Sequence, residues 1–192
     1  MTDTPWVIRR ATDEDGSFLA DMLVEAVNWS PEWKPRSRQR VLADSKTARY
    51  IAGWPRDTDL GVIAEAAGPR PATPADLPPT DSPPAEPEPA EPRLAEPAGA
   101  AWLRFLPAAE PGYGFVAEDV PELTIGVAAS WRNRGLGRAL LRSIAAEARA
   151  RGISQISLAV ERKNHAQRLY LSEGYRIVDA SDKDADTMIK DL

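Results

Sequence analysis

The chain has 192 residues, of which 43% are apolar and 28% charged, and its net charge is −5. This length and balance predict a single globular domain, residues 1–192, while the short apolar runs exclude a membrane span and the acidic charge disfavours nucleic acid as a partner. Cysteine is absent and His165 is the only histidine, which excludes disulfides and thiolate sites, so no metal is expected. Without a basic and apolar leader at the N-terminus, we expect a cytoplasmic protein.

Hydrophobic patterns predict the elements of the N-terminal half in chain order. A β-type run is followed by a stretch with one apolar helical face, then by a second helical stretch that ends at a Gly-Trp-Pro break. Two strands come next, and together they favour an antiparallel pair. The predicted ranges are 6–10 (strand), 13–28 and 36–50 (helices), and 60–67 and 100–106 (strands).

Between those two strands lies a proline-rich segment. Gly68 to Pro97 contains 11 of the chain's 18 prolines and six acidic residues, with Leu77 and Leu94 as its large apolar side chains. Such a composition cannot bury enough surface to offset the entropy of ordering. We therefore predict a disordered Pro/Glu/Ala-rich insertion over 68–98. Whether it is a tolerated long turn or a docking arm stays open.

The C-terminal half alternates between strands and helices. Leu136, Leu140, Ile144 and Ala148 recur every fourth residue and Gly152 follows them, which predicts a helix ending near 151. The other predicted elements are strands at 123–128, 156–160, 175–178 and 187–189, and a short helix at 164–173. This order favours a mixed α/β sandwich with one dominant sheet.

The turn between strand 123–128 and the following helix is the most informative segment. Glycines at Gly135 and Gly137 allow backbone N–H groups to converge, and the helix start adds its positive dipole end. Arg132, Arg134 and Arg138 lie around the same turn. Backbone donors with three guanidinium groups predict a binding site for a polyanion such as a diphosphate.

Three phosphate-binding patterns compete for this turn. A Walker A loop needs Gly-Lys-Ser/Thr, which is absent, and a Rossmann fingerprint needs a small residue where Leu140 stands. The pattern Arg/Gln-x-x-Gly-x-Gly/Ala is met in full by Arg132, Gly135 and Gly137. The remaining interpretation is an ordinary strand-to-helix loop with surface arginines.

Two segments carry a resemblance to the GNAT superfamily of N-acetyltransferases. Val127-Ala-Ala-Ser-Trp-Arg-Asn-Arg-Gly-Leu-Gly-Arg-Ala-Leu-Leu141 is similar to that family's acyl-CoA pyrophosphate loop and helix. Asn164-His-Ala-Gln-Arg-Leu-Tyr-Leu-Ser-Glu-Gly-Tyr175 is similar to its second CoA-contacting helix. The chain departs from the family pattern at Asn133, where glycine is commoner, at Ala129, where proline is frequent, and in the proline-rich insertion.

The resemblance implies a fold and a co-substrate. The fold class is α/β (α+β), with a GNAT-like mixed, mostly antiparallel central sheet flanked by about four helices in one acyl-CoA N-acyltransferase domain. The implied co-substrate is acetyl-CoA. The residues implied to bind it are Ile125, Val127, Arg132, Asn133, Arg134, Gly135, Leu136, Gly137, Arg138 and Asn164.

The resemblance also implies catalytic roles. Backbone N–H groups between Ile125 and Val127 would lie near the thioester carbonyl, and Tyr170 would be the general acid beside the sulfur. Glu122 is the candidate base, but direct transfer from an ammonium to an ordinary carboxylate costs about 8 kcal/mol. A raised carboxyl pKa, a water relay or a neutral amine is therefore required. The other interpretations are a half-buried aromatic for Tyr170 and a solvated strand-end acid for Glu122.

The predicted reaction is direct attack of a primary amine in a ternary complex. Trp29 and Trp33, with Glu25 and Glu32, form a candidate pocket for a cationic acceptor, unless the tryptophans only cover the edge of the core. A small-molecule and a peptide amine both stay open as acceptors, and so do a monomer and a homodimer. The alternative function is a non-catalytic acyl-CoA-binding or partner-binding module on the same fold.

Overall fold

The structure is a computed structural model that describes residues 6–66 and 96–192. These residues form seven strands and five α-helices, with 3-10 turns at Asp13–Asp15 and Ala129–Trp131. The order is β1 (Trp6–Arg10), α1 (Gly16–Val27), α2 (Arg38–Ala43), α3 (Ser45–Ala48), β2 (Leu60–Ala66), β3 (Pro97–Arg104), β4 (Glu122–Val127), α4 (Leu136–Ala150), β5 (Gln155–Glu161), α5 (Ala166–Ser172), β6 (Arg176–Asp179) and β7 (Ala185–Asp191).

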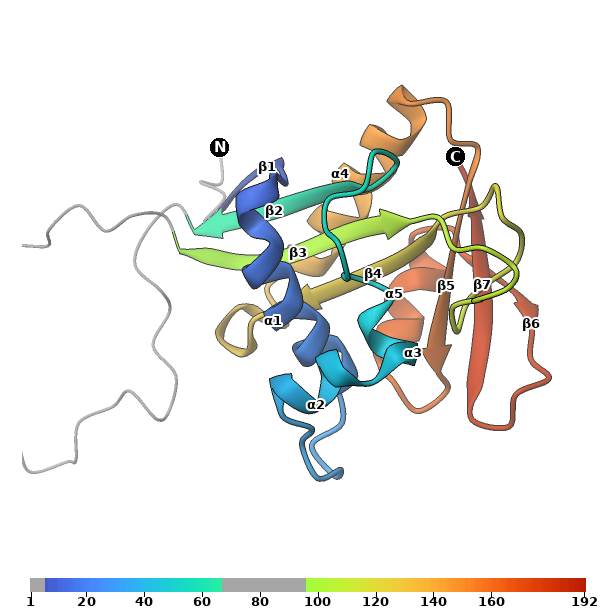
Figure 1. Cartoon of the computed structure of the whole chain (residues 1–192), viewed down its shortest axis with the longest axis horizontal. Helices are drawn as coiled ribbons and strands as arrows, with labels where there is room; N and C mark the ends of the chain where they lie inside the picture. Colours follow the sequence, from blue (N-terminus) through green and yellow to red (C-terminus); the bar gives the residue numbers. More distant parts are fainter. Residues whose placement is uncertain (1–5, 67–95) are drawn as a thin grey trace, which may run out of the picture.

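All seven strands belong to one sheet in the order β1-β2-β3-β4-β5-β7-β6. The β4–β5 pair is parallel and every other neighbouring pair is antiparallel. In Figure 1 the axes of β2, β3 and β4 lie roughly horizontally, with arrowheads that alternate in direction, and the axes of β5, β6 and β7 stand roughly upright. The predicted mixed, mostly antiparallel sheet is confirmed.

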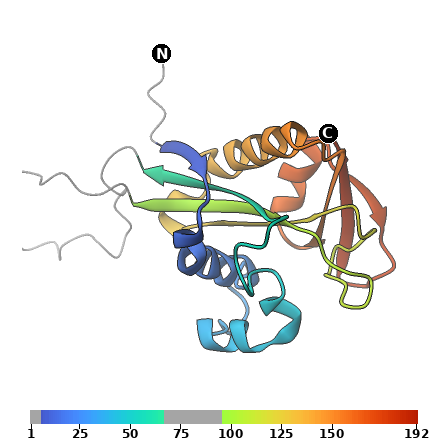
Figure 2. The same ribbon diagram turned by 45° about the horizontal axis from the view of Figure 1, so that its top comes forward.

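The helices cover both faces of the sheet, as Figure 2 shows. Helices α4 and α5 pack on one face, where Leu140 and Ile144 meet alternate strand residues such as Val62. Helices α1 to α3 lie on the other face, where Leu23 packs with Ile63. Strand side chains alternate between these two cores, which explains why neighbouring residues of β2 are both buried. No helix within the described residues is long and apolar enough to cross a membrane.

The predicted helix over 36–50 is wrong in one respect, because the structure divides it in two. Asp44 leaves the helical conformation with a ψ of 113°, and its carboxylate accepts the N–H of Lys46 at 3.0 Å to cap α3. The preceding helix α2 has its own cap at Ser37. A capping side chain in mid-segment favours a new helix start over continuation, so five helices form where about four were expected.

The predicted insertion over 68–98 ends too late. Pro97 and Ala98 belong to β3, and pairing with β2 extends one residue further, since the Ala66 N–H donates to the Glu96 carbonyl at 2.9 Å. Ala98 is fully buried against the α4 face, and that burial outweighs the proline-rich composition before it. Residues 68–95 of the predicted insertion lie outside the described residues.

Candidate functional site

Strands β4 and β5 are neighbours in the sheet but pair at a single position, Glu122 with Ser157. Beyond that position the two strands diverge (Figure 1). The N–H of Ala128 donates to β3 at 3.0 Å, and donors alternate in direction along a strand. The N–H groups of Ile125 and Val127 therefore point away from β3, into the gap between β4 and β5.

Helix α1 packs unusually closely against β4. A Cβ atom at Gly126 would lie 2.3 Å from the carbonyl oxygen of Met22 and 2.8 Å from its Cβ. Only glycine leaves room for this approach, so Gly126 allows α1 to lie directly on β4. The close packing brings the last turn of α1 to the turn that follows β4.

That turn forms a cradle of backbone donors. Asn133 and Gly135 have positive φ angles of 59° and 86°, and left-handed residues beside a helix start make successive N–H groups converge. Helix α4 begins at Leu136, and its first turn has no preceding carbonyls to bind; Ala139 donates to the Gly135 carbonyl at 3.2 Å. Asparagine tolerates positive φ better than other non-glycine residues, so Asn133 can stand where glycine is commoner.

The three arginines of the turn are not equivalent. Arg132 forms an ion pair with Glu25 of α1 at 2.5 Å, and Arg138 forms one with Glu173 at 2.8 Å. Arg134 has no acidic partner within the described residues. The Arg132–Glu25 pair is exposed on both sides and contributes less than about 1 kcal/mol, so a diphosphate can compete with Glu25 for Arg132. Glu173 is nearly buried and also pairs with Arg142.

Tyr170 lies on α5, close to the same turn. A Cβ atom at Gly137 would touch the Leu169 side chain at 3.4 Å, which shows that α5 packs against the start of α4. The Tyr170 ring meets Tyr175 edge to face at 5.7 Å, and its hydroxyl makes no hydrogen bond within the described residues. Burial raises the pKa of Tyr170 to about 12. The phenol therefore stays protonated and has its donor unused.

Glu122 lies at the closed end of the gap, where β4 and β5 pair. Its side chain is buried, and its Oε1 atom accepts the Tyr50 hydroxyl at 2.6 Å and the Gly114 N–H at 2.7 Å. Burial raises the pKa of this carboxyl, although both hydrogen bonds act in the opposite direction. The interpretation of Glu122 as a solvated strand-end acid is therefore wrong.

The predicted site residues thus follow one line along β4. Strands rise about 3.3 Å per residue, which puts Glu122 about 10 Å from Ile125 and about 17 Å from Val127. The anion cradle lies at the open end of the gap and the buried carboxyl at the closed end. Two backbone donors lie between them.

Part of the chain is similar in sequence to a known protein family. Residues 83–175 match the model of the acetyltransferase (GNAT) family. This match covers just under half of the chain and supports the resemblance to the GNAT family. No curated protein sequence matches the chain.

Solved structures share the GNAT fold at low sequence identity. The PaiA N-acetyltransferase from Thermoplasma acidophilum, solved in complex with coenzyme A, is 16% identical with a TM-score of 0.58, and the match covers 98% of this chain and 100% of that one. A ribosomal-protein-alanine N-acetyltransferase from Brucella melitensis is 22% identical with a TM-score of 0.60, covering 97% and 99%. The GNAT domain of S. lividans PAT is 19% identical with a TM-score of 0.59, covering 96% and 89%.

Asn164 is engaged by the start of α5. Its Oδ1 atom accepts the N–H of Ala166, the first residue of α5, at 2.9 Å. His165 follows it as an exposed residue before the first turn of α5. Binding of the coenzyme by Asn164 stays a prediction.

The predicted acceptor pocket is only partly assembled. Trp29 and Trp33 do meet, edge to face at 5.3 Å, and Trp33 is 46% exposed. Glu25 points instead to Arg132, and Glu32 is exposed. The acid near the Trp29 indole is Glu161 at the end of β5, without a well-formed hydrogen bond. Trp29 and Glu161 are far apart in the sequence, so no local pattern predicts that they are neighbours.

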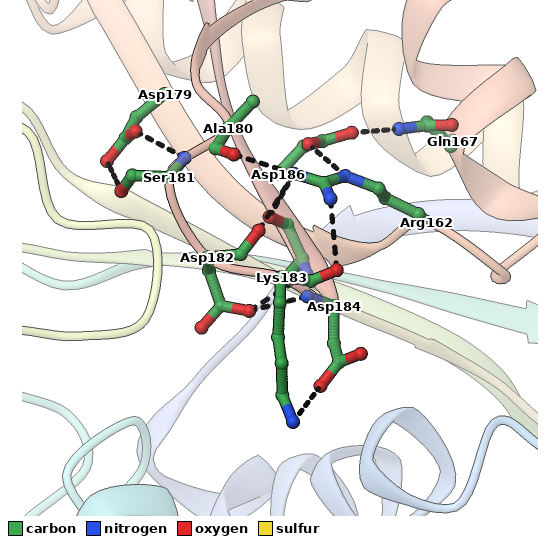
Figure 3. Close-up of polar contacts among 10 residues, drawn as sticks. Arg162, Gln167, Asp179, Ala180, Ser181, Asp182, Lys183, Asp184 and Asp186 are labelled. Atoms are coloured by element: carbon green, nitrogen blue, oxygen red, sulfur yellow. Dashed lines mark hydrogen bonds and ion pairs between the residues drawn. The ribbon is translucent and has the colours of Figure 1, made fainter.

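Next to Glu161, the β6–β7 turn is held by a single guanidinium group. Figure 3 shows Arg162 donating to the carbonyls of Ala180, Asp182 and Lys183 and to the Asp186 carboxylate. The four distances are between 2.7 and 3.0 Å. Arg162 therefore sets the shape of this turn beside the end of β5. Burial, together with the negative charges of the turn, raises the pKa of Glu161.

Sequence reasoning missed the partners of Glu122. Tyr50 follows α3 and Gly114 lies in the loop between β3 and β4. Nothing in the local pattern around Tyr50 indicates a contact with a residue 72 positions away. The only sequence signal near Gly114 is the Gly-Tyr-Gly run at 112–114, which lies in a loop without a helical or strand pattern. Such runs are too common in loops to predict a contact with Glu122.

Proposed function

We propose that this chain is an acetyl-CoA-dependent N-acetyltransferase that transfers an acetyl group to a primary amine by direct attack. The observation that carries the proposal is the divergence of β4 and β5, with two free backbone donors facing the gap and an anion cradle at its open end. The match of residues 83–175 to the GNAT family model and the likeness to a fold neighbour solved with coenzyme A support the same co-substrate.

The cradle suits the diphosphate of a coenzyme. The first-turn N–H groups of α4, residues 136–138, and the Arg134 guanidinium supply donors and positive charge without a competing acid. Arg132 adds a cation when it exchanges the exposed Glu25 carboxylate for phosphate, and Arg138, which shares Glu173 with Arg142, adds another at the start of α4. Acetyl-CoA bound here would supply the activated thioester.

The residues in the gap have complementary tasks. The N–H groups of Ile125 and Val127 are donors for the carbonyl oxygen on which negative charge develops during attack. Tyr170 would give its unused hydroxyl proton to the departing thiolate; its pKa of about 12 lies roughly 3.5 units above that of an ordinary thiol, so the transfer costs about 5 kcal/mol. Glu122 would accept the proton that the ammonium group of the acceptor loses. Its raised pKa lowers the cost of that transfer.

The acceptor in this proposal is a small-molecule or peptide amine that approaches from the α1 face. Trp29 and Trp33 offer aromatic surface there, and Glu161 offers negative charge beside them. An aromatic surface with an adjacent carboxylate favours a cationic amine. The Brucella neighbour, by its name, acts on an alanine of a ribosomal protein, so a peptide with N-terminal alanine belongs among the first amines to try.

The experiment measures release of free thiol from acetyl-CoA with a panel of amines: a polyamine, an aromatic monoamine, a peptide with N-terminal alanine and a peptide with an internal lysine. We expect thiol release with at least one amine and formation of the matching acetylamide by mass spectrometry. Thermal stabilisation by acetyl-CoA without thiol release across the panel would instead favour a non-catalytic acyl-CoA-binding module. If coenzyme A does not bind at all, both functions fail.

A further inference from the structure

The carboxylate of Glu122 is held by one of its two oxygens. Oε1 accepts two hydrogen bonds, from the Tyr50 hydroxyl and the Gly114 N–H. Oε2 is buried and has no hydrogen-bond partner within the described residues. A buried carboxylate oxygen without a donor is costly when ionised. Such an arrangement is expected where the oxygen accepts a proton during the reaction.

Tyr50 is fixed from several sides. Its hydroxyl oxygen accepts the Tyr113 N–H at 2.7 Å, so its own proton is directed to Glu122. Its ring stacks on the Tyr113 ring with an interplanar angle of 7°, and its carbonyl accepts the Trp102 indole N–H at 2.8 Å. The buried Arg104 holds the flanking chain by donating to two carbonyls, those of residues 49 and 52, at 2.9 Å each. Both the side chain and the backbone of Tyr50 are therefore fixed.

The free oxygen lies against the loop that covers it. A Cβ atom at Gly112 would be 1.9 Å from Oε2 and 2.7 Å from the Tyr50 hydroxyl oxygen, so the loop backbone touches the carboxylate directly. Gly112 also lines an open groove of about 340 Å³ together with Arg49. Solvent therefore comes within one residue of Oε2.

The remaining charged and polar groups around Glu122 come from three elements. Arg49, beside α3, is the cation that acts on the carboxyl. Arg104 on β3 is paired across the strands with Glu122, but its charge is matched by the buried Asp59 carboxylate at 2.5 Å. Ser157 on β5 has a fully buried hydroxyl without a partner in the described residues. None of them donates to Oε2.

We propose that Tyr50 is a positioning residue for proton acceptance: it and the Gly114 N–H hold Oε1, which leaves Oε2 as the atom that receives the proton. This inference rests on the proposed function. The ammonium nitrogen of the acceptor loses a proton to a solvent water, the water passes a proton to Oε2, and Glu122 becomes neutral while the amine becomes the nucleophile. The Tyr50 hydroxyl keeps its proton throughout, since burial and the Glu122 charge raise the pKa of Tyr50.

The test follows the ionisation of Glu122 directly, by ¹³C NMR titration of its labelled carboxyl carbon in the whole protein. A hydrogen bond to the ionised form lowers a carboxyl pKa, so Tyr50→Phe should raise the pKa of Glu122 by about one unit. The matched control is Tyr113→Phe, which removes the hydroxyl of the stacked ring but no hydrogen bond to Glu122. This variant should leave the pKa of Glu122 unchanged. Replacing Tyr50 with 3-fluorotyrosine, a stronger donor of similar size, should move the pKa the opposite way.

The same variants are then followed by the pH dependence of kcat/KM, with the panel amine that wild type turns over fastest. The acidic limb reports ionisation of the base in the free enzyme, so it should move up in Tyr50→Phe by the amount seen in the titration. An unchanged pKa of Glu122 in Tyr50→Phe overturns the inference, and so does a shifted pKa with an unmoved acidic limb. If wild type turns over no amine, it is the proposed function that fails, and the titration still decides whether Tyr50 controls Glu122.

Discussion

Glu25 near the end of α1 and Arg132 in the turn after β4 form an ion pair with N···O at 2.5 Å across 107 positions of sequence. The pair joins the helix that lies on the gap to the turn proposed to bind a diphosphate. Both side chains are more than a third exposed, so the pair itself contributes little to stability. Its position is more informative than its strength, because the Glu25 carboxylate pairs with Arg132, a cation that the coenzyme diphosphate would bind.

Removing that carboxylate should strengthen coenzyme binding. In Glu25→Gln, Arg132 has no ion pair to break before it binds phosphate. We therefore expect the Kd for coenzyme A to fall by about two- to fivefold, which corresponds to an exposed ion pair worth under about 1 kcal/mol. Isothermal titration at two salt concentrations measures it, and the gain should shrink at high salt. Asp21→Asn is the matched control, because Asp21 lies on α1 like Glu25 but pairs with Arg38 of α2, not with the turn. Equal affinities in both variants would contradict a role for Arg132.

Two glycines at opposite ends of α4 separate backbone strain from ligand binding. Gly135 and Gly152 both have positive φ, 86° and 75°, and a Cβ atom at either would meet nothing within 4 Å. Alanine at each should cost about 1–2 kcal/mol of unfolding free energy. Only Gly135→Ala should weaken coenzyme A binding, by about tenfold or more, because only that residue shapes the cradle. Chemical denaturation measures the loss of unfolding free energy, and calorimetry measures the affinity for coenzyme A. An equal loss of affinity in both variants would contradict a role of the turn at Gly135 in binding.

Tyr170 and Tyr175 provide a second matched pair. Their rings pack edge to face, and both hydroxyls lack a hydrogen-bond partner within the described residues. Tyr170→Phe should lower kcat by about 100-fold, the lower range for a general acid, and leave the Kd of acetyl-CoA unchanged. Tyr175→Phe should keep kcat within about twofold of wild type. Stopped-flow thiol release measures both, and a similar loss in the two variants would indicate packing instead of proton donation.

Ionisation of Glu122 should destabilise the fold. The pKa of Glu122 is raised above its ordinary value of 4.5, so the folded state binds a proton more tightly and stability falls as pH rises from 4.5 through the raised pKa. Glu122→Gln removes this effect. Its Tm should equal that of wild type near pH 4 and exceed it at pH 8, by about 2–4 °C for each 1 kcal/mol. Calorimetric scans at both pH values test this, with the exposed Glu110→Gln as control.

Arg162 should control local order in the β6–β7 turn. It donates to three carbonyls of that turn and to the buried Asp186 carboxylate, so Arg162→Ala removes four hydrogen bonds from the turn and takes the cation away from Asp186. We expect amide hydrogen exchange over residues 180–185 to accelerate at least tenfold while exchange in α4 stays constant. Arg168→Ala is the control, since that exposed arginine on α5 makes no side-chain hydrogen bond within the described residues. Mass spectrometry of peptic fragments resolves the two segments.

Local patterns in the sequence predicted most of the elements and the turn proposed to bind an anion. The four-residue repeat of α4, the alternation in β5 and the glycines at Gly135 and Gly137 are local patterns, and each depends on residues within one or two turns. The resemblance to the GNAT family rested on two such local segments and was confirmed. The boundaries that failed, at Asp44 and at Pro97–Ala98, are positions where a capping side chain or burial against a distant strand outweighs the local composition.

The parts of the site that join distant segments depend on how the whole chain packs. The single pairing of Glu122 with Ser157 opens the gap, and Gly126 admits α1 to β4 only because Met22 arrives there. The partners of Glu122 and the acid beside Trp29 likewise come from segments far away in sequence. Periodicity records which face of an element is apolar, but it does not record which other element covers that face. That choice depends on the simultaneous packing of all layers, and it is why the candidate base was named from the sequence while the tyrosine that holds it was not.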